Sequence, residues 1–307
     1  MRVGLALAAS TDFGQIPALA RQAEEAGFDL IASGEHVFFH ESVPNGLIAL
    51  AAAAGATERI RLLSALTLLP TYPAPLAAKM VATLDGVSNG RFEFGVGVGG
   101  EYPSELRACG VDPKHRGAYT DEALEIITAL FTGEPVTYEG RFCTVEGDRL
   151  LPPPVQRPGP PIWIGGRKPA AFRRAGRFAD VWMPYLMEPH QVAESLTAAR
   201  EQAVLAGRKA NALRGAYFAW SNIDRDGDRA VRNGVEFLSR AYNQDMGRVA
   251  DRYLVLGTPE RLVERLSEYQ AAGVETVVIA LASKDAGICA AVDLLATEVV
   301  PALRKLT

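Results

Sequence analysis

Short apolar runs alternate with helical patterns along the whole chain. This alternation is typical of repeated βα units that build a parallel sheet. Eight runs are predicted to be strands: Arg2–Ala8, Asp29–Ser33, Ile60–Thr67, Arg91–Val96, Pro161–Ile164, Ala179–Pro184, Gly215–Ser221 and Thr276–Leu281. Eight units favour a (β/α)8 TIM barrel over an open doubly wound sheet. We therefore predict one α/β barrel domain over residues 1–307.

The helices between these strands carry recognisable start and stop residues. In Gln15–Ala26 the apolar residues fall on one face, and Gly27 is placed to end the helix. Pro259–Ala272 has Thr258 as its N-cap and Pro259 at its first helical position. These signals place helices where a barrel needs them.

Two segments interrupt the alternation and are predicted to be insertions after strands four and seven. Val136–Pro160 has two short β-like runs around Gly140 and then a proline-rich connector, and Asp224–Gly257 is charged and helical. Barrel enzymes place their sites at the carboxyl ends of the strands, so either insertion is a candidate wall or lid. Plain surface elaboration is the alternative.

Composition narrows the class of partner. The chain has a net charge of -4 and a pI near 5.7, which removes the electrostatic drive toward nucleic acid or anionic membranes. Cys109, Cys143 and Cys289 are too few and too far apart for a disulfide framework or a cysteine metal site. The apolar start of the chain is interpreted as a first buried strand and not as a signal peptide. We expect a cytoplasmic protein that acts on a small molecule.

A short glycine motif suggests a rival cofactor. Gly95, Gly97 and Gly100 satisfy G-x-G-x-x-G after a predicted strand, the fingerprint of a nicotinamide dinucleotide site. That fingerprint also requires a helix opening at the third glycine and an acidic residue about 20 positions later at a strand end. The acids at that distance, Asp121 and Glu122, lie in a helical run instead. The dinucleotide interpretation is therefore disfavoured.

The end of the second predicted strand carries candidate acid–base chemistry. Glu35 and His36 lie there, and the unperturbed pKa of histidine near neutrality suits a general acid or base. A surface-loop histidine is the alternative. A zinc site from His36 and His40 is a further rival, but the spacing is β-like and leads toward Pro44, so we predict no metal site.

The end of the fifth predicted strand carries candidate phosphate chemistry. Gly165 and Gly166 precede Arg167, Lys168 and a helix whose N-terminus is itself partly positive. Such a cluster of positive charge is stable next to an anion, and glycine N–H groups at a helix start bind phosphate well. Further cations follow at Arg173, Arg174 and Arg177. The alternative is a solvated basic helix face.

Four blocks of sequence, taken in order, resemble the bacterial luciferase-like monooxygenase superfamily. They are GFDLIASGEHV, RIRLLSALTLLPTYPAPLAAKMVATLDGVSNGRFEFGVGVGG, RPGPPIWIGGRKPAAFRRAGRFADVWMP and GTPERLVERLSEYQAAGVE. Together they span nearly the whole chain. The PPIWIGG and HRG segments are most similar to the branch of probable F420-dependent oxidoreductases.

The resemblance implies a (β/α)8 barrel, commonly a homodimer, that binds a flavin or the deazaflavin F420. It implies that Glu35 and His36 lie beside the ring and that Ser64 and Ala65 form a bulge behind it, where the family often has a non-prolyl cis peptide. It further implies that Gly97, Val98, Gly99 and Gly100 line the cofactor groove, and that Gly165 and Gly166 receive the phosphate, flanked by Ile164 and Arg167.

Two departures from the family pattern disfavour glucose 6-phosphate as substrate. Sugar-phosphate dehydrogenases have Trp where this chain has His40, and they have a glutamate where this chain has Ser10-Thr11-Asp12.

The function predicted from these features is hydride transfer between F420 and a small organic substrate. His36 is the expected proton donor or acceptor, with Glu101 as a second catalytic candidate. The alternatives are an FMN-dependent monooxygenase that uses oxygen, a non-catalytic flavin-binding paralogue, and a metal-dependent barrel hydrolase.

Overall fold

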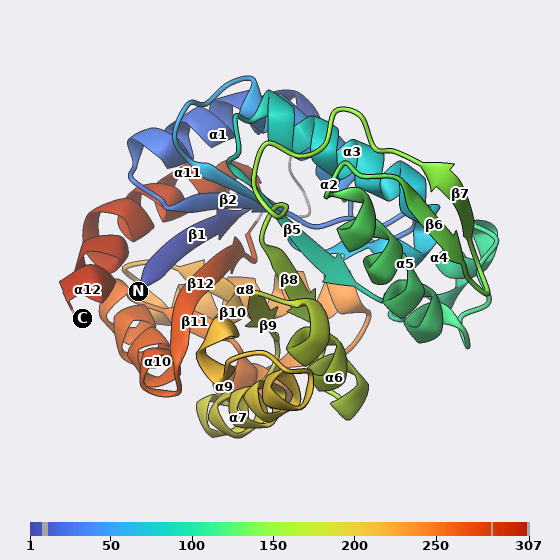
Figure 1. Cartoon of the computed structure of the whole chain (residues 1–307). Coiled ribbons are helices and arrows are strands. Elements are labelled where there is room, and N and C mark those ends of the chain that lie inside the picture. The colour runs from blue at the N-terminus through green and yellow to red at the C-terminus, as the bar shows by residue number, and fades with distance from the viewer. Residues whose placement is uncertain (8–11, 284, 306–307) are drawn as a thin grey trace.

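A closed parallel barrel forms the centre of the molecule, with helices around it (Figure 1). The computed structural model describes residues 1–7, 12–283 and 285–305. The barrel strands are β1 (Arg2–Ala6), β2 (Leu30–Ser33), β3 (Arg61–Ser64), β5 (Phe92–Gly97), β8 (Ile162–Gly165), β9 (Val181–Met183), β10 (Arg214–Ile223) and β12 (Val274–Leu281). Each pairs in parallel with its neighbours, and pairing of β9 with β10 closes the sheet. The predicted TIM barrel is confirmed.

Helices lie outside the barrel, between successive strands and after the last strand. They are α1 (Ile16–Glu25), α2 (Gly46–Ala54), α3 (Ala74–Val87), α4 (Pro103–Ala108), α5 (Arg116–Leu130), α6 (Pro169–Phe178), α7 (Pro189–Leu205), α8 (Gly227–Tyr242), α9 (Ala250–Tyr253), α10 (Pro259–Ala271), α11 (Asp285–Leu294) and α12 (Val300–Lys305). The predicted N-cap is confirmed at α10, where the Thr258 side chain accepts a hydrogen bond from the N–H of Arg261. No helix in the described part of the chain is long and apolar enough to cross a membrane.

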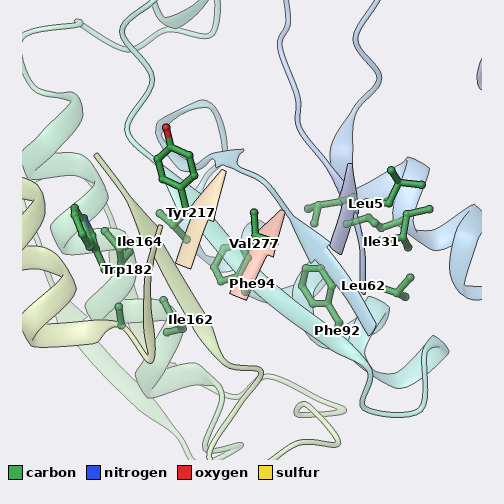
Figure 2. Close-up of a cluster of buried hydrophobic side chains, with 14 of the residues drawn as sticks. Leu5, Ile31, Leu62, Phe92, Phe94, Ile162, Ile164, Trp182, Tyr217 and Val277 are labelled. Carbon is green, nitrogen blue, oxygen red and sulfur yellow. The ribbon is translucent and has the colours of Figure 1, made fainter. Parts of the chain in front are cut away.

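Side chains alternate along the strands between two apolar layers. Residues such as Leu5, Ile31, Phe92 and Phe94 lie in the large core between strands and helices (Figure 2). Their sequence neighbours point into the barrel, where they form a second cluster: Ala6, Leu30, Ala32, Leu63, Trp163, Val181, Met183, Ala216, Val278 and Ala280. Burial on both faces explains why the strands are continuous apolar runs.

Strand boundaries differ from the predictions mainly at the carboxyl ends. Two short strands extend the sheet there: β4 (Thr67–Leu68) pairs with the end of β5, and β11 (Val255–Gly257) pairs with the end of β10. The expectation that Asp224–Gly257 is helical is confirmed for α8 and α9 and wrong at its end, where β11 pairs with the backbone of the extended β10. The predicted end of strand one, Ala8, lies outside the described residues.

The first insertion packs on the outside of the barrel. β6 (Val136–Glu139) and β7 (Thr144–Asp148) form an antiparallel hairpin. At its tip, the N–H groups of residues 141–143 donate to the carboxylate of Glu122 on α5 at 2.8–2.9 Å. Because the hairpin follows α5 and not β5, it covers that helix (Figure 1). The surface-elaboration alternative therefore describes this insertion.

Candidate active site

The loop after β2 turns Glu35 into the protein. Its buried carboxylate accepts hydrogen bonds from the N–H groups of Leu68 (2.7 Å) and Gly46 (3.2 Å) and from the hydroxyl of Tyr72 (2.9 Å). Asn45 Nδ2 is a further donor at 3.3 Å. Burial raises the pKa of Glu35, against the opposing effect of these hydrogen bonds. Glu35 thus ties α2 and the segment after β3 to the loop.

His36 points the other way and forms a pair with a glutamate far along the chain. Its Nδ1 lies 3.1 and 3.2 Å from the two carboxylate oxygens of Glu105 on α4. Glu105 is fully buried and also accepts hydrogen bonds from the N–H groups of Val37 and Phe38. Because a carboxylate only accepts, Nδ1 carries the hydrogen in this pair, and Nε2 is left free of Glu105. This is the arrangement of an oriented general base.

Glu101 faces the free nitrogen of that imidazole. Its Oε2 lies 3.7 Å from Nε2 of His36, and its other carboxylate oxygen accepts a hydrogen bond from the hydroxyl of Tyr185. Burial, followed by the nearby Glu101 charge, raises the pKa of the Tyr185 phenol well above its usual range. Tyr185 is therefore a permanent donor to Glu101.

Aromatic rings surround His36. Phe39 stacks on the imidazole with centroids 4.4 Å apart, and Tyr102 meets it edge-on at 6.2 Å. Tyr242, at the end of α8, contacts Phe39 and accepts a hydrogen bond from Trp220 Nε1 at 3.0 Å. The second insertion therefore contributes to the wall of this candidate site. Of the two predicted possibilities, wall or lid and plain surface elaboration, the contact with Phe39 favours the first.

An ion pair ties that insertion to the loop after β2. Arg240 on α8 lies 2.8 Å from the carboxylate of Glu41. The two segments are 199 positions apart in the chain, so this contact is a product of the fold.

The backbone between β3 and β4 forms the predicted bulge. A non-prolyl cis peptide joins Ala65 to Leu66. The Ser64 hydroxyl is turned to Gly95, donating to its carbonyl at 3.0 Å and accepting from its N–H at 2.9 Å. A Cβ on Gly95 would overlap the Ser64 carbonyl, and one on Gly165 would overlap the Leu66 side chain. The glycines of two neighbouring strands thus make room for the bulge.

The turn after β5 leaves the sheet in a conformation that favours glycine. Gly99 and Gly100 have φ of 65° and 131°. A Cβ on Gly100 would lie 3.4 Å from Nε of Arg116, the first residue of α5. That Nε is buried and has no hydrogen-bond partner among the described residues. An unpaired buried guanidinium nitrogen next to a bare backbone fits an anionic group of a ligand.

The basic run around α6 is only partly available to a ligand. Arg174 pairs with Asp121 at 2.6 Å and Arg177 with Glu125 at 2.5 Å, both on α5. The expectation that these two cations join a phosphate site is therefore wrong, because the neighbouring helix neutralises them. The guanidinium of Arg167 donates to the Leu186 carbonyl at 2.9 Å. Gly165 and Gly166 do precede the start of α6, as predicted.

The structure brings most of the predicted residues to one end of the barrel. Oε2 of Glu101 lies 3.7 Å from Nε2 of His36, Ser64 lies against Gly95, and the next residues of the bulge lie against Gly97. Ile164 points into the helix-facing core, so only its backbone borders the site. Val98 is partly exposed in the turn between Gly97 and Gly99. Ser10 and Thr11, at the end of strand one, lie outside the described residues.

Sequence reasoning missed Glu105, Tyr185, Tyr242 and Arg116. Glu105 lies in the first turn of α4, where an acidic residue is expected for the helix dipole alone. Its pairing with His36 spans 69 positions and left no local signal. The same is true of Tyr185 and Glu101, which are 84 positions apart.

The rival chemistries find less support in this geometry. Among the described residues, no three His, Cys, Asp or Glu side chains gather as a metal site would need. His36 is bound to Glu105, while His40 packs edge-on against Tyr102 at 5.0 Å. A short helix does begin three residues after Gly100. Asp121 and Glu122 lie inside α5 and not at a strand end, as predicted, so the acidic residue of a dinucleotide site is not in place.

The model of one protein family matches residues 1–276 of the chain: luciferase-like monooxygenase. The chain belongs to this family. Its members are flavin- or deazaflavin-dependent oxidoreductases, so the chain is an enzyme of that kind. The family prediction made from the four sequence blocks is confirmed.

Solved structures share the fold over nearly the full length. Monooxygenase RslO1 from Streptomyces bottropensis is 26% identical with a TM-score of 0.87, covering 98% of this chain and 99% of its own. An F420-dependent secondary alcohol dehydrogenase, solved with an F420–acetone adduct, is 22% identical with a TM-score of 0.87 and 99% coverage of both chains. The FMN-bound oxygenating component of 3,6-diketocamphane monooxygenase from Pseudomonas putida is 20% identical, with a TM-score of 0.79 and 98% coverage of both chains.

Proposed function

We propose that this protein is an F420-dependent oxidoreductase that interconverts an alcohol and a carbonyl group on a small organic substrate. The observation that carries the proposal is the His36–Glu105 pair, which orients an imidazole at the carboxyl end of the barrel with its Nε2 turned away from Glu105. The likeness to the F420-dependent secondary alcohol dehydrogenase is consistent with this chemistry.

The residues present fit a phosphorylated, flavin-like cofactor. Inward-facing positions near the carboxyl ends of β1, β2 and β12 are small, namely Ala6, Ala32 and Ala280, which suits a flat ring on that side, whereas the Leu66 side chain fills the space over Gly97 and Gly165. The unpaired Nε of Arg116 and the N–H groups of Gly165 and Gly166 would hold the phosphate. The bulge at Ala65 and Leu66 would support the ring.

The division of labour between cofactor and protein follows from the site. When bound, F420 supplies a carbon that accepts or gives a hydride. In the direction of alcohol oxidation, Nε2 of His36 takes the hydroxyl proton as the C–H bond breaks, and the substrate becomes a carbonyl compound. Glu105 holds the imidazole in the required tautomer and stabilises its protonated form. The Glu101 side chain is 38% exposed, and its Oε2 lies 3.7 Å from Nε2 of His36.

A titration of the purified protein with F420 and with FMN, followed by fluorescence, tests the cofactor assignment. We expect saturable binding of F420 at lower concentration than FMN. His36→Ala should then lower turnover by about 10²-fold or more while cofactor affinity stays within about twofold. Turnover that survives this substitution would remove the assigned role of His36.

An FMN-dependent monooxygenase is the second candidate. The 26% identity to a monooxygenase favours it. The residues proposed to surround the ring would suit FMN as well as F420. Pairing of Arg174 and Arg177 with α5 also removes part of the charge that would favour the oligoglutamate tail of F420. Tighter binding of FMN together with substrate-dependent oxygen uptake would favour this candidate.

A homodimer is part of the same proposal. α2 is apolar around its circumference, and Ile48 on it is 68% exposed. Leu76 on the adjacent α3 and Leu151, whose carbonyl binds Lys79 of α3, are 50% and 62% exposed. Exposed apolar groups on neighbouring helices are typical of a subunit interface. Ile48→Glu should convert a dimer to a monomer in analytical ultracentrifugation.

A further inference from the structure

A chain of contacts links the Gly165–Gly166 turn to His36 through Tyr185. The guanidinium carbon of Arg167 lies 4.9 Å from the centroid of the Tyr185 ring. The Tyr185 hydroxyl donates to one oxygen of Glu101, and the other oxygen lies 3.7 Å from Nε2 of His36. These residues follow β8, β9, β5 and β2, and β5, β8 and β9 are neighbours in the barrel (Figure 1).

The two ends of the Tyr185–Glu101 contact are held very differently. Tyr185 follows β9 and is bridged to Phe218 of β10, whose N–H donates to the Pro184 carbonyl at 2.9 Å. Glu101 follows two glycines with positive φ, and glycines have no side chain to pack. The polar contacts of the Glu101 carboxylate among the described residues are the Tyr185 hydroxyl and Nε2 of His36.

From this contrast we infer that Tyr185 is a positioning residue of the acid–base site. Its hydroxyl holds Glu101 against Nε2 of His36, and Arg167 covers the Tyr185 ring. The proton that Nε2 takes from the substrate then passes to the partly exposed Glu101 and on to water, because Glu105 on the other nitrogen is fully buried. The assignment of Nε2 as the reacting nitrogen rests on the proposed function.

The first test uses the full-length protein without substrate and reads the imidazole directly. The chain has four histidines, so ¹⁵N-histidine labelling gives few resonances, and His36→Gln identifies that of His36. At pH 7, Glu101→Gln should shift the Nε2 resonance of His36. Tyr185→Phe should shift it in the same direction, and should add nothing further in the Glu101→Gln background.

The chain provides a matched control. The Tyr138 hydroxyl donates to the carboxylate of Glu125, the same kind of contact, between β6 and α5. Tyr138→Phe should leave the His36 resonance and turnover unchanged. With F420 bound and turnover followed by cofactor absorbance, Tyr185→Phe should lower kcat about tenfold and change the KM for F420 less than about twofold.

Two results would overturn the inference. In the first, Glu101→Gln shifts the Nε2 resonance of His36 but Tyr185→Phe does not. In the second, Tyr185→Phe shifts the resonance by the same amount in the Glu101→Gln background as in the native protein. If Tyr185→Phe does not fold, Glu101→Asp, which withdraws the carboxylate from the hydroxyl, should give the same shift. Failure to bind F420 would contradict the proposed function and leave the resonance comparison intact, so the two failures are distinguishable.

Discussion

Two buried glutamates near His36 have the same chemistry and opposite consequences. Glu35 is its neighbour in the chain, and its carboxylate accepts hydrogen bonds from donors at the start of α2 and in the segment after β3. Glu105 lies 69 positions away, accepts from two backbone N–H groups, and still accepts from Nδ1 of His36. The first carboxylate holds the fold of the loop, and the second orients the His36 imidazole.

The comparison shows that adjacency in sequence is a poor guide to partnership in a site. The resemblance placed Glu35 beside the cofactor together with His36, and that contact stays a prediction. In the structure, the donors around each carboxylate decide its role, and those donors come from other elements. Substitutions at the two glutamates should therefore separate turnover from stability.

The largest effect is expected at Glu105. Glu105→Gln removes the charge that stabilises protonated His36 and puts an amide against its Nδ1. Turnover should fall by about 10²- to 10³-fold, which corresponds to about 3–4 kcal/mol in the activation barrier. Steady-state kinetics measure it. Glu125→Gln on α5 is the matched control, and equal kinetics for the two variants would contradict the pairing.

Glu35→Ala should act on stability first. It leaves the N–H groups of Leu68 and Gly46 and the Tyr72 hydroxyl without their acceptor, at an expected loss of about 3 kcal/mol in the free energy of unfolding. Urea denaturation measures the loss. Unchanged stability of Glu35→Ala together with a large loss of turnover would contradict the structural role assigned to Glu35.

A smaller effect is expected at Asn45, which donates to Glu35 and also caps α2 by accepting from the N–H of Ile48 at 3.0 Å. Asn45→Ala should lower the free energy of unfolding by about 1 kcal/mol. Turnover should stay within about twofold. A loss of turnover much greater than about twofold would show that the Asn45–Glu35 network affects His36.

The smallest effect is a pH dependence of stability. Because burial raises the pKa of Glu35 above its ordinary value of 4.5, the folded state binds the proton more tightly than the unfolded state. Its contribution to stability is thus complete below pH 4.5 and is lost as the pH rises through the folded-state value. The stability of the native protein relative to Glu35→Gln should decrease over that range in urea titrations. An increase would show that the four hydrogen bonds outweigh burial.

The barrel could be predicted because its signal is local. Each strand is a short apolar run followed by a helical pattern, and the eight runs agree with the eight barrel strands to within a few residues. Caps such as Thr258 are also read from neighbouring residues. β11 was missed because three residues gain strand structure only from the β10 edge beside them.

The candidate site could be predicted only in part. His36, Glu101 and the glycines at the strand ends could be proposed from the sequence because barrel sites lie at that end of the strands, and their roles stay predictions. Charge was a weaker guide to the site. In the sequence, Arg174 and Arg177 resemble part of a phosphate-binding run, but in the structure they pair with carboxylates of α5.

The sequence by itself determined the alternation of strands and helices, the barrel, and the family, since these depend on periodicity and on short motifs. Only the tertiary structure brought Glu105 against Nδ1 of His36, the Tyr185 hydroxyl against Glu101, and Glu35 against backbone donors of α2 and the segment after β3. The physical reason is that a hydrogen bond requires donor and acceptor to meet within about 3 Å, and here the partners come from strands and helices far apart in the chain.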